Sequence, residues 1–177
     1  MSSTLGFAIL AVLARSERSG YEIAARMRQP VGYFWTASHS QIHGELQKLL
    51  TGGLVGFEAR HGPGPQDKKI YRITPEGLAE LREWVTAPPR ARPERDELVL
   101  KTYASWLADP AEVRRLFAEQ LAVHEARLAE YEREKESFGG EPVFGDPAFG
   151  GWAALRCGLG YERHRADWCR WMLDQLS

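Results

Sequence analysis

Imidazole, amide and hydroxyl side chains gather in one short stretch, SHSQIHGELQKLLTGGLV at residues 38–55, where their spacing suits recognition chemistry. Ser38 and Gln41 form an S-x-x-Q arrangement, which is typical of the capped beginning of a helix, and Gly52-Gly53 is typical of its end. Apolar residues recur within the stretch at i, i+4 and i+7, namely Ile42, Leu46 and Leu49. This pattern predicts a helix with one buried face.

The polar side chains of this predicted helix fall on the face opposite the apolar residues. Short or planar hydrogen-bonding groups of this kind read base edges in the major groove of DNA, and Gly44 beside them would allow a close approach. We expect DNA contacts from Ser38, His39, Ser40, Gln41, His43 and Gln47. A metal site is a weaker interpretation, because no acidic or thiol residue is placed to complete a tetrahedral set with the two histidines. A merely solvated face is the other alternative.

The segment that follows favours the DNA-contact interpretation. Two β-prone runs, LVGFEAR at 54–60 and KIYRIT at 69–74, flank the turn-forming HGPGPQDK, which predicts a hairpin. A hairpin directly after the second helix of a helix-turn-helix is a wing. Its lysines, Lys68 and Lys69, are placed to contact phosphates or the minor groove. Double-stranded DNA is therefore the expected partner.

Three further helices are predicted in the first part of the chain. Residues 4–14 are almost wholly apolar, as expected for a helix buried on most sides. Ser19 and Glu22 form a capping box that begins a short second helix, and Pro75 begins another after the hairpin. Together these elements predict a winged helix-turn-helix domain, with a two-stranded wing, at residues 1–86.

The second part of the chain is expected to be all α. The proline-rich APPRARPER at 87–95 predicts a linker, and residues 96–177 predict long helices interrupted by a Gly/Pro-rich break at 139–151. Apolar residues recur there with heptad spacing, which predicts a helical dimerisation domain. The expected interface residues are Phe117, Leu121, His124, Leu128, Tyr131, Leu159 and Leu173. His124 is interpreted as a hydrogen-bonded interface residue in preference to a pH switch.

Three quoted segments resemble a known family: SGYEIAARM, SHSQIHGELQKLLTGGLV and KIYRITPEGLAELREWV, in this order and spacing, look like the winged-helix half of PadR transcriptional regulators. The second half resembles the C-terminal helical region of the PadR subgroup with a larger dimerisation domain. The resemblance implies a homodimeric repressor that binds a palindromic operator and is released by a small molecule or another signal. This chain has His39 and His43 where the family usually has proline and tyrosine. Its wing has PQDKK where the family usually has arginine with proline and glycine.

The tryptophans raise a question about a small-molecule effector. Trp152, Trp168 and Trp171 could line a pocket for a flat aromatic compound, although filling the core and the dimer interface is the favoured role. Cys157 and His164 lack a third group and an oxyanion donor, so no catalytic residue is assigned and no enzyme is expected. No cofactor or metal is expected either.

Composition limits the remaining functions. The 177 residues, 44% of them hydrophobic, can bury the core of one large or two small domains. A net charge of −1 gives no global attraction to nucleic acid or membrane, so charged contacts must be local. The longest apolar run, LGFAILAVLA, is too short for a membrane span and follows no basic region, so no signal peptide is expected.

The two cysteines fit a reduced, cytoplasmic protein, because they lie too far apart on one predicted helix to form a disulfide. Two alternatives to a repressor stay open. One is a winged helix that serves as a protein–protein adaptor. The other is a small-molecule-binding helical dimer that binds no DNA.

Overall fold

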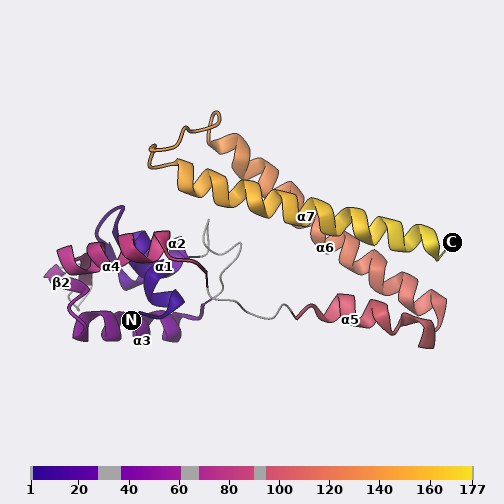
Figure 1. Cartoon of the computed structure of the whole chain (residues 1–177), viewed down its shortest axis with the longest axis horizontal. Coiled ribbons are helices and arrows are strands. Elements are labelled where there is room, and N and C mark those ends of the chain that lie inside the picture. Colours follow the sequence, from indigo (N-terminus) through magenta and orange to yellow (C-terminus); the bar gives the residue numbers. More distant parts are fainter. Residues whose placement is uncertain (1, 28–36, 61–67, 90–94, 177) are drawn as a thin grey trace. The chain divides into compact units, whose positions relative to one another are not determined.

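The computed structural model describes residues 2–27, 37–60, 68–89 and 95–176 (Figure 1). The chain divides into two compact units, Met1–Pro89 and Arg90–Ser177. Helices dominate both units, and the first also contains a small antiparallel sheet, which confirms the predicted, mainly α fold class. Within the described ranges, no helix has both the length and the apolar character needed to cross a bilayer.

In the residues that the structure describes, the first unit contains four helices. They are α1 Thr4–Leu13, α2 Gly20–Arg26, α3 His39–Thr51 and α4 Pro75–Thr86. Both predicted capping boxes are present, at Ser19 for α2 and at Ser38 for α3. The Thr74 hydroxyl caps α4 by accepting a hydrogen bond from the Gly77 amide at 3.0 Å. Local sequence therefore determines where these helices begin.

The sheet has one strand more than the sequence predicts. Its strands are β1 Arg18–Ser19, β2 Val55–Arg60 and β3 Lys68–Ile73, in the order β1-β3-β2. The pairing of β2 with β3, from Val55 opposite Ile73 to Arg60 opposite Lys68, confirms the predicted hairpin. β1 pairs with the other edge of β3, so the expected two-stranded wing is part of a three-stranded sheet. A strand of two residues is too short to produce a periodic pattern.

The core of the first unit lies around α1 and α3. Ile9 and Leu10 of α1 are completely buried, together with Ile23 of α2 and Leu46 of α3. A Cβ on Gly77 would lie 2.1 Å from the carbonyl oxygen of Leu54, so α4 packs directly on the backbone between α3 and the hairpin. Close packing of this kind holds α3 and the wing in one rigid unit.

The second unit is a pair of long helices preceded by a short one. Its elements are α5 Glu97–Tyr103, the 3-10 helix Ser105–Leu107, α6 Pro110–Ser137 and α7 Phe149–Gln175. Figure 1 shows α6 and α7 running side by side as an antiparallel hairpin. Asp109 caps α6 as predicted, accepting a hydrogen bond from the Ala111 amide. α7 begins at Phe149, slightly earlier than the predicted end of the Gly/Pro-rich break.

The predicted heptad seam lies inside this hairpin. Phe117, His124 and Tyr131 of α6 are buried, as is Leu159 of α7. Leu121, Leu128 and Leu173 are half-buried. The seam packs against α7 of the same chain, and its predicted place between subunits stays a prediction. An antiparallel partner within the chain satisfies the same heptad spacing as a helix of a second subunit.

His124 makes a buried polar contact in the seam. Its Nδ1 lies 2.5 Å from Oε2 of Glu162, and both side chains are almost completely buried. Arg127 approaches the other carboxylate oxygen at 3.7 Å from the solvent side. The predicted hydrogen-bonded role of His124 is thus present, but the hydrogen bond joins α6 to α7 within one chain.

Candidate nucleic-acid interface

The orientation of α3 is the basis of the candidate interface. Ile42, Leu46 and Leu49 are at most 2% exposed and face the core. The polar residues assigned to DNA contact on this helix are all exposed: His39, Ser40, Gln41, His43 and Gln47, with Ser38 at the cap. A Cβ on Gly44 would meet no atom of the described residues within 4 Å, so among these residues nothing covers the surface beside the imidazoles. The predicted division of the helix into a buried face and a polar face is confirmed.

Two of the predicted contact residues also build the cap of α3. The Ser38 hydroxyl accepts a hydrogen bond from the Gln41 amide, and the Gln41 side-chain oxygen accepts one from the Ser38 amide at 2.8 Å. The hydroxyls of Ser38 and Ser40 lie 3.0 Å apart. The cap therefore occupies the Gln41 carbonyl oxygen, and a base contact from Gln41 would use its NH2 group.

Two imidazoles dominate the exposed face. The ring centroids of His39 and His43 are 4.9 Å apart, with the rings inclined by 39°. Tyr21 of α2 lies beside them, with its ring centroid 6.5 Å from that of His39. Tyr21 is not among the contact residues that the sequence predicts. Its position between a cap and the first apolar residue of α2 carries no periodic signal.

A buried carboxylate on α3 anchors the helix to α1. Glu45 is 6% exposed, accepts a hydrogen bond from the Ser3 hydroxyl at 2.5 Å, and pairs with Lys48 at 3.1 Å. Burial opposes ionisation of Glu45, but the hydrogen bonds from Ser3 and Lys48 outweigh it and lower the pKa of the carboxyl. The local sequence does not predict this contact, because the two residues lie 42 positions apart.

The two predicted wing lysines are exposed and each has a neighbour. The Lys68 ammonium lies 3.3 Å from the Glu22 carboxylate, and the Lys69 ammonium lies over the Phe57 ring, 4.6 Å from its centroid. Hydrogen bonds from the side chain and backbone of Ser19, with a contribution from Lys68, lower the pKa of Glu22 to about 2. Glu22 therefore stays ionised and partly offsets the Lys68 charge. The wing tip, residues 61–67, lies outside the described residues.

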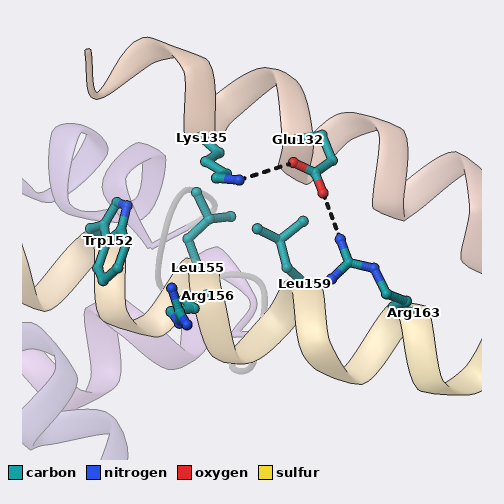
Figure 2. Close-up of a pocket in the computed structure, with 7 residues that line it drawn as sticks. All are labelled: Glu132, Lys135, Trp152, Leu155, Arg156, Leu159 and Arg163. Atoms are coloured by element: carbon teal, nitrogen blue, oxygen red, sulfur yellow. Dashed lines mark hydrogen bonds and ion pairs between the residues drawn. The ribbon is translucent and has the colours of Figure 1, made fainter. Parts of the chain in front are cut away.

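The three tryptophans assigned to a ligand are not brought together. Trp152 lines a pocket of about 160 Å³ on the α6–α7 hairpin. Trp168 packs edge-on against Phe117, with ring centroids 5.5 Å apart, and Trp171 is 53% exposed. The pocket is lined by Glu132, Lys135, Trp152, Leu155, Arg156, Leu159 and Arg163 (Figure 2). Of these residues, only Trp152 is predicted from the sequence to contact a ligand.

A capped helix with a buried apolar face, an exposed polar face and a following hairpin packed on the same core defines a winged helix-turn-helix protein. Residues 9–83 match the transcriptional regulator PadR-like family, and residues 94–177 match the family described as virulence activator alpha C-term. The negative transcriptional regulator PadR of Bacillus subtilis is 34% identical over 177 residues, which cover 98% of this chain and 97% of that protein. The chain belongs to the PadR-like family of transcriptional regulators.

Solved structures agree over the whole length. Bacillus subtilis PadR in complex with operator DNA superposes with a TM-score of 0.90 at 31% identity, covering 99% of this chain and 100% of that one. The same protein in complex with p-coumaric acid gives a TM-score of 0.84 at 31% identity, covering 98% and 99%. The resemblance stated from sequence is thereby confirmed for both halves.

Proposed function

We propose that this chain is a transcriptional repressor that binds a palindromic operator as a homodimer and dissociates when a small molecule binds. The exposed face of α3 carries the proposal, because its imidazole and amide groups are free of the core and lie on a helix that the core holds rigidly. A relative has been crystallised with operator DNA. The proposed activity involves no catalytic step, and its site of action would be the cytoplasm.

The proposed roles of α3 and of the wing lysines follow the docking geometry of helix-turn-helix proteins. The second helix of the motif, here α3, enters the major groove, so His39, His43 and Gln47 would meet base edges. Lys68 and Lys69 would meet phosphates beside the groove, which adds affinity but no sequence information. With a net charge of −1 for the whole chain, such local placement replaces a global electrostatic attraction.

An exposed apolar surface supports the proposed homodimer. α5 has no buried residue, and large apolar side chains on it and on the following 3-10 helix are largely exposed. They are Leu100, Tyr103, Trp106 and Leu107, and each residue is 66% to 84% exposed. Exposed apolar patches mark interaction sites. The proposed dimer surface is this one, together with the half-buried Leu121, Leu128 and Leu173.

A mobility shift on the DNA upstream of the gene for this chain tests the proposal. We expect specific binding to an inverted repeat whose half-sites lie about one helical turn apart, roughly 34 Å, or a multiple of it. The complex should survive excess unrelated DNA and weaken as salt rises. A complete lack of DNA binding at low salt would instead support the protein–protein adaptor.

We propose the α6–α7 pocket as the effector site. Figure 2 shows Leu155 and Leu159 facing the centre of the pocket, with Trp152 and Arg156 at one side. Glu132 bridges Arg163, at 2.8 Å, and Lys135, at 3.7 Å. Apolar and cationic groups around one hollow suit a small anionic compound with a flat apolar part. The complex of a relative with p-coumaric acid makes that compound a suitable first probe.

Replacing Arg156 with glutamine tests the effector site. We expect the variant to bind the operator normally but to need roughly tenfold more p-coumaric acid for release, because a charge-assisted hydrogen bond is lost. Fluorescence anisotropy of labelled operator measures both quantities. Arg170→Gln is the matched control, since Arg170 is an exposed arginine of the same helix that pairs with Glu125 outside the pocket. Equal release from wild type and Arg156→Gln would place the effector site elsewhere.

A further inference from the structure

Two consecutive residues of α2 lie against the two imidazoles of α3. A Cβ on Gly20 would lie 3.2 Å from Cε1 of His43. The lack of a side chain at Gly20 therefore leaves room for the His43 ring. Tyr21 lies against His39, with the rings inclined by 46°. Because His39 and His43 also contact each other, the three rings form a row that runs from α2 onto α3. We call Tyr21, His39 and His43 the ring row.

The Tyr21 side chain does little for the fold. It is 68% exposed, although tyrosine is a large residue that usually buries most of its ring, and it does not belong to the core cluster of the first unit. The adjacent residue, Glu22, holds Lys68 at the start of β3. The first turn of α2 therefore contacts α3 through Gly20 and Tyr21, and the wing through Glu22.

The position of Tyr21 suits two actions in a DNA complex. In helix-turn-helix docking the first helix crosses the phosphate backbone while the second enters the groove, so a side chain of α2 next to α3 meets phosphate. A tyrosine hydroxyl donates hydrogen bonds to phosphate oxygens. A ring beside His39 would also restrict the rotation of the imidazole before DNA arrives, which would reduce the entropy lost on binding.

We propose that Tyr21 is a specificity-determining positioning residue: its ring orients the His39 imidazole toward a base, and its hydroxyl binds a DNA phosphate. The inference rests on the proposed function and adds to it a role for α2 in base recognition. The two actions belong to different parts of one side chain. Tyr21→Phe removes the hydroxyl alone, and Tyr21→Ala removes the ring as well.

The test measures the affinity of each variant for the operator and for a panel of operators with one base pair replaced at each half-site position. We expect Tyr21→Phe to weaken binding about tenfold and uniformly across the panel, because a phosphate contact carries no sequence information. We expect Tyr21→Ala to weaken binding at least as much and, in addition, to reduce discrimination at least threefold at the positions where His39→Ala also reduces it.

Nuclear magnetic resonance of the free protein gives a second readout. The Hε1 resonance of His39 should shift in Tyr21→Ala, where the neighbouring ring is lost, and stay nearly unchanged in Tyr21→Phe. Tyr161→Ala is the matched control, because Tyr161 is a tyrosine of α7 that is 54% exposed. The control should match wild type in affinity and discrimination. Thermal unfolding should be alike in all four proteins, since both tyrosines are exposed.

The outcomes separate this inference from the proposed function. If Tyr21→Ala binds and discriminates like wild type while His39→Ala does not, the role of Tyr21 is refuted and the repressor proposal stands. A uniform loss in Tyr21→Ala with unchanged discrimination also refutes the positioning role. If the wild-type protein binds no operator at all, both proposals fail together.

Discussion

Alanine at both His39 and Gln47 is expected to weaken operator binding by about a hundredfold or more, without changing the oligomeric state. Each good base contact contributes roughly 1–3 kcal/mol of discrimination, and a dimer would lose two such residues from each half-site. Both side chains are exposed and lie opposite the buried leucines, so the core of the first unit is left intact. Salt dependence comes from charged contacts to phosphates, and neither side chain carries a charge when the imidazole is neutral. The salt dependence of the remaining binding should therefore change little.

Anisotropy titrations at several salt concentrations, together with sedimentation, check this expectation. A double variant of His164 and Gln175, also to alanine, is the matched control, because it removes the same two side-chain types from exposed positions of α7. Undiminished operator binding by the His39 and Gln47 variant would contradict the assignment of α3 as the recognition helix. A parallel loss of dimerisation would show that the variant acts indirectly.

Replacing His124 with leucine is expected to destabilise the second unit by roughly 3–5 kcal/mol. The reason is that Glu162, which is 4% exposed, would lose the partner that lies 2.5 Å away and leave a carboxylate buried. Glu162→Leu should cost less, roughly 1–3 kcal/mol, because the group then left unpaired is an imidazole. Leucine at both positions should lower the free energy of unfolding by less than the sum of the two single changes, since neither polar group is then left buried without its partner.

Urea unfolding at one fixed protein concentration measures these differences, because dimerisation makes stability depend on concentration. Arg127→Ala serves as the control: Arg127 is 54% exposed in its side chain and lies 3.7 Å from Glu162, so its loss should cost little. Strictly additive single changes would show that His124 and Glu162 are not coupled. The pair would then have no role in joining α6 to α7.

Features encoded within a few residues of sequence were predictable. The capping boxes at Ser19 and Ser38, and the Asp109 cap of α6, depend on neighbours at most three residues away. The buried and exposed faces of α3 follow from helical periodicity alone. The hairpin is likewise local, because its turn residues and alternating strands are adjacent in sequence.

Features that depend on tertiary neighbours were not predictable. The heptad pattern on α6 predicts that the helix has a partner but not which chain supplies it. Glu162 interrupts an apolar stripe in the sequence, and only the fold reveals that it lies opposite His124. Tyr21 and Glu45 gain their roles from residues of other helices. A stripe of tryptophans favours a core or an interface but is also compatible with a pocket.

The open position at Gly44 has a consequence for engineering. Glycine in the middle of a helix lowers stability by roughly 0.5–1 kcal/mol relative to alanine, and no atom lies within 4 Å of a Cβ built there. A Cβ at residue 44 would therefore meet no steric obstacle in the described part of the protein. The position offers a route to redesigned operator preference, or an attachment point for a fluorophore that senses a docked duplex.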